Sequence, residues 1–149
     1  MHLSLIVLAA GKGTRMNSDL PKVLQPLGGA PLIAHALASG RALEPDHVVV
    51  VAGHGAEAVR KAVARFDPDA QVVLQHEQLG TAHAVAQARD AVPGGDAVVL
   101  YGDTPFLTPE TLARLTEARG RFDLVVLGFR AADPKRYGRL VTEGDALQA

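Results

Sequence analysis

The sequence predicts an α/β fold with a mostly parallel β-sheet that is covered by helices on both faces. Two observations support this prediction. Strand-like and helix-like stretches alternate along the chain, and the strand-like stretches are nearly continuous apolar runs. Alternation is typical of a parallel sheet with helical crossovers, and continuous apolar strands are typical of a sheet buried on both sides. With 149 residues, 48% of them apolar, the chain is long enough for one domain with a sizeable core.

The first part of the chain is predicted to form two strands joined by a helix. Leu3–Ala9 is apolar except for one serine, and His47–Ala52 contains four consecutive valines, so both are expected to be buried strands. Between them, Pro31–Gly40 is expected to be a helix, because Ile33 and Leu37 fall on one helical face.

Two further helix–strand pairs follow. Ala56–Phe66 has apolar residues at helical spacing and is predicted to be a helix, followed by a strand at Ala70–Gln75. Leu79–Ala91 is the next predicted helix, and the apolar run Ala97–Tyr101 is the fourth strand.

The C-terminal part is predicted to contain one more helix and three more strands. Thr108 can cap a helix whose first turn begins with Pro109, a residue that is favoured at that position. Asp123–Phe129 is predicted to be the fifth strand. Tyr137–Thr142 and Ala146–Ala149, separated by a short turn, are predicted to form a hairpin.

Polar segments follow three of these strands at their carboxyl ends. A glycine-rich loop begins at Gly11 after the first strand, Gln75 ends the third, and Asp103 follows the fourth. Ligands of open α/β sheets bind beyond the carboxyl ends of the strands. The sequence therefore predicts that these three segments converge on one ligand site.

The loop after the first strand has the composition of a polyphosphate site. Gly11 and Gly13 let the backbone turn and approach a ligand, and their amides can line an anion site together with the Thr14 hydroxyl. The cations in or near this loop are Lys12, Arg15 and Lys22. The common phosphate motifs are absent, because Met16 replaces the third glycine of the dinucleotide fingerprint and no P-loop pattern occurs.

Three motifs carry a resemblance to a known family. The run Leu8–Met16, followed by Pro21 and Lys22, resembles the motif of nucleotidyltransferases that act on sugar phosphates. The runs Gln75–Ala84 and Leu100–Pro105 resemble the uridyltransferase half of the bifunctional bacterial N-acetylglucosamine-1-phosphate uridyltransferase/glucosamine-1-phosphate acetyltransferase. This resemblance implies a Rossmann-like (glycosyltransferase A-like) three-layer α/β/α fold.

The resemblance also implies a reaction. It is Mg²⁺-dependent uridylyl transfer from UTP to N-acetylglucosamine 1-phosphate, which gives UDP-N-acetylglucosamine and pyrophosphate for cell-envelope peptidoglycan synthesis. The nucleotide-binding residues that it implies are Leu8, Ala9, Ala10, Gly11, Gly13, Thr14, Lys22, Gln75, Gln78, Gly80, Thr81, Tyr101, Gly102 and Asp103.

Individual roles follow from the same resemblance. Asp103 would bind Mg²⁺, Arg15 would bind the leaving pyrophosphate, and Lys22 would bind the α-phosphate, the last two as catalytic residues. Gly138 would present its amide to the sugar phosphate. The segment from Gln75 to Thr81 would read uracil, because carboxamides can both donate and accept hydrogen bonds; Ala82 departs from the family, which usually has glycine there.

Composition limits the other partners. The net charge of −1 does not favour nucleic acid or a membrane surface, and no signal peptide or apolar run of about 18 residues is found, so a cytoplasmic protein is expected. The chain contains no cysteine, which excludes thiol chemistry. Family members continue well beyond this length and form homotrimers through an acetyltransferase domain. We therefore expect this chain to keep some UTP affinity but to have little turnover.

Three alternatives remain open. One is another nucleotidyltransferase of the same fold, such as molybdenum-cofactor guanylyltransferase, against which the Gln75–Thr81 segment argues. A second is a non-catalytic nucleotide-binding module. The weakest is a dinucleotide-binding oxidoreductase, because Ala52 and Gly53 stand where an acidic residue would bind the ribose.

Overall fold

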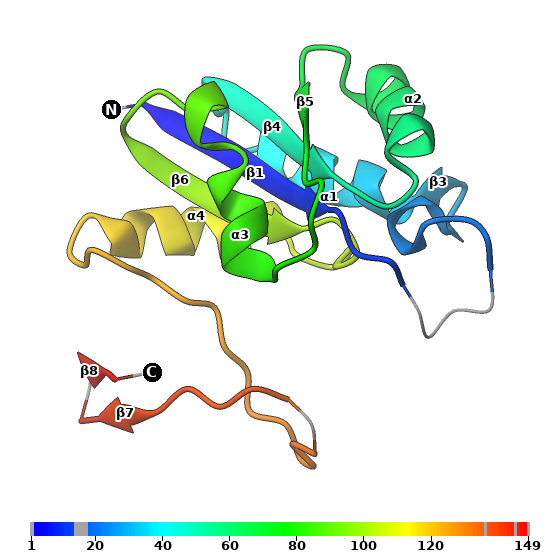
Figure 1. Ribbon diagram of the computed structural model, residues 1–149. Helices are drawn as coiled ribbons and strands as arrows, with labels where there is room; N and C mark the ends of the chain where they lie inside the picture. Colours follow the sequence, from blue (N-terminus) through cyan, green and yellow to red (C-terminus); the bar gives the residue numbers. More distant parts are fainter. Residues whose placement is uncertain (1, 14–17, 136, 145, 149) are drawn as a thin grey trace. The chain divides into compact units, whose positions relative to one another are not determined.

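The computed structural model describes residues 2–13, 18–135, 137–144 and 146–148 (Figure 1). The chain forms two compact units, Met1–Arg114 and Leu115–Ala149. In the part of the chain that is described, none of the helices combines the length and the apolar character needed to cross a membrane.

The first unit is built on a four-stranded parallel sheet. Its strands are β1 (Leu3–Ala9), β4 (His47–Ala52), β5 (Gln71–Leu74) and β6 (Asp96–Tyr101), in the order β5-β4-β1-β6. All neighbouring strands in this sheet run parallel. The four strands and the parallel sheet predicted from the sequence are thereby confirmed, with end shifts of one residue at β5 and β6.

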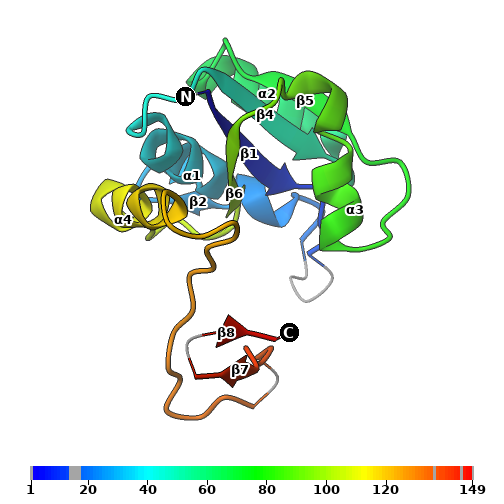
Figure 2. The ribbon, with the colours of Figure 1, turned by 90° about the vertical axis from the view of Figure 1, so that its left-hand side faces the viewer.

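Helices cover both faces of this sheet (Figure 2). Helices α1 (Leu32–Arg41) and α2 (Ala56–Phe66) lie on one face, and α3 (Thr81–Ala86) packs on the other. Side chains of β1 alternate between the faces, so that Leu5 lies against α1 while Ile6 joins the cluster under α3. The predicted three-layer arrangement is confirmed.

The order of the strands creates a switch point between β1 and β6. The chain moves outward from β1 to β4 and β5, and then crosses back over the opposite face to β6. Helices α1 and α3 therefore leave the sheet on opposite sides, which opens a crevice at the carboxyl ends of the strands.

Several smaller elements differ from the predictions. The predicted helix 79–91 begins at Thr81, because Gly80 has φ 100°, and it ends at Ala86 before a short 3₁₀ turn at Arg89–Ala91. A small hairpin of β2 (Pro26–Leu27) and β3 (Ala30–Pro31) was not predicted.

Helix α4 (Pro109–Arg119) begins where the sequence predicts. The Thr111 amide donates to the Thr108 hydroxyl oxygen at 3.3 Å, and this bond confirms Thr108 as the N-cap. Leu112 is fully buried.

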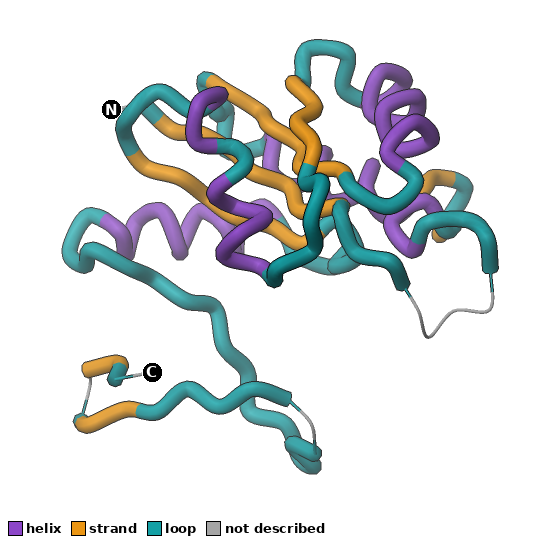
Figure 3. The backbone as a smooth tube through the Cα atoms, in the orientation of Figure 1, coloured by secondary structure: helices purple, strands orange, loops and turns teal. Residues whose placement is uncertain are grey.

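The second unit contains a hairpin of β7 (Thr142–Glu143) and β8 (Ala146–Leu147), shown in Figure 3. The predicted hairpin is confirmed, although its strands are shorter than expected. The predicted strand Asp123–Phe129 is wrong, because these residues pair with no strand. Leu124 and Phe129 are each 71% exposed. The apolar pattern indicated strand propensity, but a strand also needs a hydrogen-bonding neighbour.

Candidate functional site

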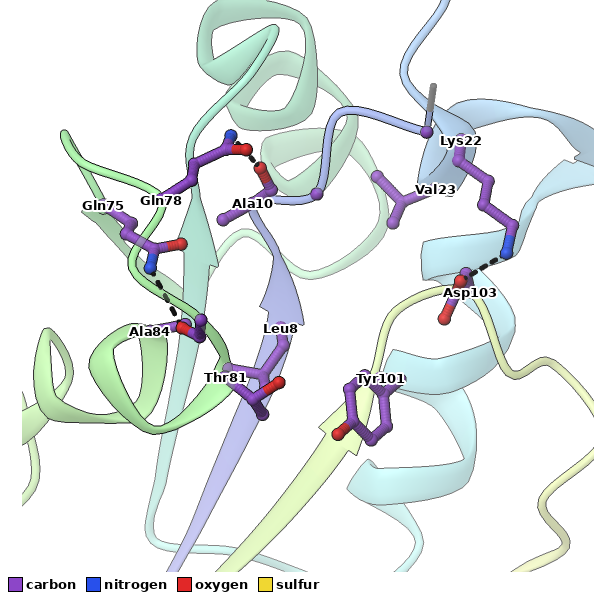
Figure 4. Close-up of a pocket in the computed structure, with 13 residues that line it drawn as sticks. Leu8, Ala10, Lys22, Val23, Gln75, Gln78, Thr81, Ala84, Tyr101 and Asp103 are labelled. Atoms are coloured by element: carbon purple, nitrogen blue, oxygen red, sulfur yellow. Dashed lines mark hydrogen bonds and ion pairs between the residues drawn. The ribbon is translucent and has the colours of Figure 1, made fainter. Parts of the chain in front are cut away.

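A pocket of about 480 Å³ lies at the carboxyl ends of β1, β5 and β6 in the first unit (Figure 4). It is formed by all three segments that the sequence predicted to converge. The residues that line it are Leu8, Ala10, Gly11, Gly13, Lys22, Val23, Gln75, Gln78, Gly80, Thr81, Ala84, Tyr101 and Asp103.

One end of the pocket carries an ion pair. Lys22 Nζ lies 2.6 Å from Asp103 Oδ2, and the two side chains are 44% and 29% exposed. Lys22 follows Pro21 in a short 3₁₀ turn, and Asp103 lies in the turn after β6. The Thr104 hydroxyl donates to the Tyr101 carbonyl at 2.8 Å and fixes that turn. A cation and a carboxylate from distant parts of the chain are thus held together beside the glycine-rich loop.

Two glycines shape this end of the pocket. Gly13 has φ 58°, and a Cβ atom there would lie 3.0 Å from Lys22 Cβ. At Gly102, a Cβ would lie 3.1 Å from the Leu8 carbonyl oxygen and 3.2 Å from Val23 Cγ1. These glycines let the loops pack closely, and Gly102 donates its N–H to the Leu8 carbonyl at 2.9 Å.

The other end of the pocket carries two carboxamides. The Gln75 side chain is 5% exposed, and its Nε2 donates to the Gly80 carbonyl oxygen at 3.3 Å and lies 3.0 Å from His83 Nδ1. Gln78 Nε2 donates to the Ala10 carbonyl oxygen at 2.7 Å, which ties the loop after β5 to the loop after β1. The Gln75 carboxamide oxygen points into the pocket (Figure 4).

Some predicted site residues are not among the described residues that line this pocket. The Ala9 side chain is buried in the sheet on the face opposite to Leu8, and Gly102 is buried and is not a lining residue. Thr14 and Arg15 fall outside the described residues. Gly138 belongs to the second unit. The binding roles of these residues stay predictions.

Two lining residues were not predicted. Val23 follows Lys22 directly, and Ala84 lies one helical turn after Thr81 on the same face of α3. Both are small apolar residues without a motif of their own. Helical spacing from Thr81 could have indicated Ala84.

The donor set fits magnesium bound together with a substrate. Among the residues that the structure describes, no three His, Cys, Asp or Glu side chains come close enough to hold a metal by themselves. Mg²⁺ commonly binds through one or two carboxylates plus substrate phosphates. The half-buried Asp103 carboxylate, beside a loop suited to phosphates, meets that requirement.

The pocket brings together a glycine-rich loop, a lysine and an aspartate at the carboxyl ends of a parallel sheet, which is the arrangement that the resemblance to nucleotidyltransferases implies. Residues 5–139 match the family model described as MobA-like NTP transferase domain. The chain belongs to this family.

Similar proteins agree with this assignment. The chain is 67% identical, over 97% of its length, to the bifunctional protein GlmU of Cereibacter sphaeroides, and spans about a third (32%) of that relative. This similarity confirms the resemblance found in the sequence. HddC from Yersinia pseudotuberculosis, solved with GMP-PN, shares the fold at TM-score 0.82 and 22% identity, over 100% of this chain and 68% of HddC. Rv0371c from Mycobacterium tuberculosis, solved with manganese, matches at TM-score 0.65 and 27% identity, over 79% of this chain and 59% of Rv0371c.

Proposed function

We propose that this chain carries the nucleotide site for Mg²⁺-dependent uridylyl transfer from UTP to N-acetylglucosamine 1-phosphate. The observation that carries the proposal is the 67% identity to the bifunctional protein GlmU over 97% of the chain. The activity is a proposal for this chain because it spans about a third of that relative's length.

The carboxamide end of the pocket supports uracil as the base. The Gln75 carboxamide oxygen faces the pocket as a hydrogen-bond acceptor, while Nε2 of the same carboxamide donates a hydrogen bond to the Gly80 carbonyl. Uracil presents an N–H donor at N3, whereas cytosine presents an acceptor there. Since an unpaired buried acceptor costs about 1–3 kcal/mol, this arrangement favours UTP over CTP.

The ion-pair end of the pocket supports the transfer chemistry. The sugar-phosphate oxygen attacks the α-phosphorus of UTP, the bond to the β-phosphate breaks in line, and pyrophosphate leaves. Such transfer depends mainly on positioning and charge neutralisation. The Lys22 ammonium binds the α-phosphate and offsets its developing charge, while Arg15 binds the leaving pyrophosphate. Asp103 would hold Mg²⁺, which would supply further positive charge at the phosphates, and the manganese in the Rv0371c structure supports a divalent ion in this fold.

The first test is the thermal midpoint of the chain with Mg²⁺ and each of UTP, CTP, GTP and ATP. A ligand that binds only the folded state raises this midpoint by mass action. We expect a selective increase with UTP, and a smaller increase for Gln75→Ala with the same nucleotide. A selective increase with GTP would instead favour a guanylyltransferase. If no nucleotide raises the midpoint, the proposed site is wrong.

Turnover separates an enzyme from a binding module. We expect UTP binding by this chain with little release of pyrophosphate, because the chain spans about a third of the length of the GlmU relative that it matches. Robust pyrophosphate release that depends on N-acetylglucosamine 1-phosphate would contradict that expectation and would show that this chain is catalytic by itself.

A further inference from the structure

His83 lies outside the pocket lining but contacts the residue that reads the base. It is on α3, half-buried, two positions after Thr81, and its Nδ1 lies 3.0 Å from Gln75 Nε2. None of the motif roles assigned above uses this histidine. Its position directly behind Gln75 raises the question of what it contributes to the site.

The direction of the Gln75 carboxamide is fixed by its neighbours. The Gly80 carbonyl, 3.3 Å from Gln75 Nε2, can only accept a hydrogen bond, so the nitrogen of the carboxamide must face it. The second N–H of the same nitrogen then needs another acceptor. His83 Nδ1 is the group within reach, at 3.0 Å.

Each ring nitrogen of His83 lies beside a carboxamide nitrogen, so only one of the two can accept a hydrogen bond when the ring is neutral. Burial favours Nδ1 as that acceptor, because Gln75 is 5% exposed, whereas Gln87 is half-buried and has more room to turn its amide. Nδ1 accepts from Gln75, and the proton of the neutral ring is therefore on Nε2. The Gln87 carboxamide lies 3.2 Å from Nε2 on the other side of the ring, and its oxygen can accept that proton when the amide is turned over. In that turned arrangement, Gln87 gives up the hydrogen bond that its Nε2 donates to the His83 backbone carbonyl at 3.2 Å. The imidazole is thus held between two carboxamides.

We infer that His83 is a positioning residue for base selection. By accepting from Gln75 Nε2, it keeps both N–H groups of that carboxamide inside the protein and leaves the oxygen facing the pocket. The pocket is then an acceptor site that pairs with the N3–H of uracil. Without His83 Nδ1, the carboxamide keeps only its bond to the Gly80 carbonyl. Turning its N–H₂ group toward the base, the arrangement that suits cytosine, then costs less. This inference rests on the proposed function, since it concerns the uridine preference of the same site.

Substitutions test the inference through the ratio of CTP to UTP dissociation constants, measured with Mg²⁺. His83→Phe keeps a ring but removes the acceptor, and we expect it to lower this ratio by roughly two- to tenfold, the range that one hydrogen bond accounts for. His83→Asn places an oxygen where Nδ1 stood and is expected to retain most of the ratio. His47→Phe, at the exposed amino end of β4, is the matched control and should leave the ratio unchanged.

The outcomes separate this inference from the proposed function. If the unmodified chain shows no preference for UTP, both are overturned. If it prefers UTP and His83→Phe keeps the full ratio, only the role of His83 is overturned. An independent readout uses the unmodified chain alone: two-bond ¹H–¹⁵N NMR spectra of the imidazole should show the proton of His83 on Nε2. A proton on Nδ1 in the neutral ring would overturn the inference.

Discussion

At the scale of single residues, the ion pair between Lys22 and Asp103 is the main charged feature of the pocket. Both side chains are partly exposed, and ion pairs of this kind contribute about 0–1 kcal/mol to stability. The pair is therefore better explained by its effect on ligands than by its effect on folding. In the structure each charge neutralises the other. Under the proposed function, Mg²⁺ would replace Lys22 beside Asp103, and a phosphate would replace Asp103 beside Lys22.

Asp103→Asn is expected to remove the Mg²⁺ dependence of UTP binding while changing the thermal midpoint by little. The amide keeps the shape of the side chain but loses the charge that holds a hard cation. Isothermal titration of UTP, with Mg²⁺ and with a chelator, measures this dependence. Asp133→Asn, which alters an exposed carboxylate paired with Lys135 in the second unit, is the control. A full Mg²⁺ dependence in Asp103→Asn would rule out Asp103 as the metal ligand.

At the scale of elements, the turn before α2 supports the loop that carries Lys22. Gly55 has φ 67° at the N-cap of α2, and a Cβ atom there would collide with Pro21 Cγ. Any side chain at this position is therefore strained twice, by its backbone angle and by its contact with the residue before Lys22.

Gly55→Ala is expected to destabilise the first unit by about 1–2 kcal/mol and to weaken UTP binding, because Pro21 must move. Chemical denaturation and UTP titration measure the two effects. Gly94→Ala is the matched control, since a Cβ atom there meets nothing within 4 Å. Equal stability of the two variants would show that the close approach of Gly55 to Pro21 is not a real constraint.

Helices α1 and α2 are joined by a second ion pair. Arg41 Nε and Nη2 donate to Asp67 at 2.8 and 2.6 Å, and Asp67 is 6% exposed. The hydrogen bonds to Asp67 raise the pKa of the Arg41 guanidinium above its ordinary value. This ion pair has two hydrogen bonds and a buried carboxylate, whereas the ion pairs on the surface have both side chains exposed.

Asp67→Asn is expected to lower the free energy of unfolding by about 2 kcal/mol, because it removes a charge-assisted acceptor from a buried position. Glu57→Gln breaks an exposed pair with Lys61 on α2 and should cost less than about 0.5 kcal/mol. Urea denaturation of both variants measures the difference. If both lose the same small amount, the buried pair contributes no more than a surface pair.

The sequence predicts best those elements whose apolar pattern matches their burial in the fold. β1 and β4 were predicted with their observed bounds because their apolar runs are long and both faces are buried. The β2–β3 hairpin was missed, because two-residue strands that contain Pro26 and Pro31 have no strand pattern. In the site, glycines and polar side chains at strand ends were predictable. The apolar lining residues Val23 and Ala84 were not, since only the folded loops bring them there.

At the scale of the whole molecule, the two units differ in how their apolar residues are placed. The first unit buries its two central strands, β1 and β4, and in β1 Leu5 and Val7 are at most 1% exposed. In the second unit, Phe122 is 57% exposed and Leu140 is 51% exposed. Stability should therefore be concentrated in the first unit.

Amide hydrogen exchange is expected to divide the chain accordingly. β1 pairs with a strand on each side, and its hydrogen-bonded amides should exchange only when the first unit unfolds globally. Amides of residues 123–130, which are in no strand, should exchange faster by orders of magnitude. Slow exchange in residues 123–130 would show that they form a strand in solution.

The central position of β1 has a consequence for the order in which the molecule is assembled. Its partner β4 lies about 40 residues along the chain, but β6 lies more than 90 residues away, as in the pair Ser4↔Ala97. Closing the longer loop costs more chain entropy, so the β5-β4-β1 half can form before β6 docks. Lys22 is in the part that can form first, whereas Asp103 follows β6, the strand that docks last. Nucleotide binding would then appear only when the sheet is complete, and a nucleotide would act as a template that holds the final strand in place.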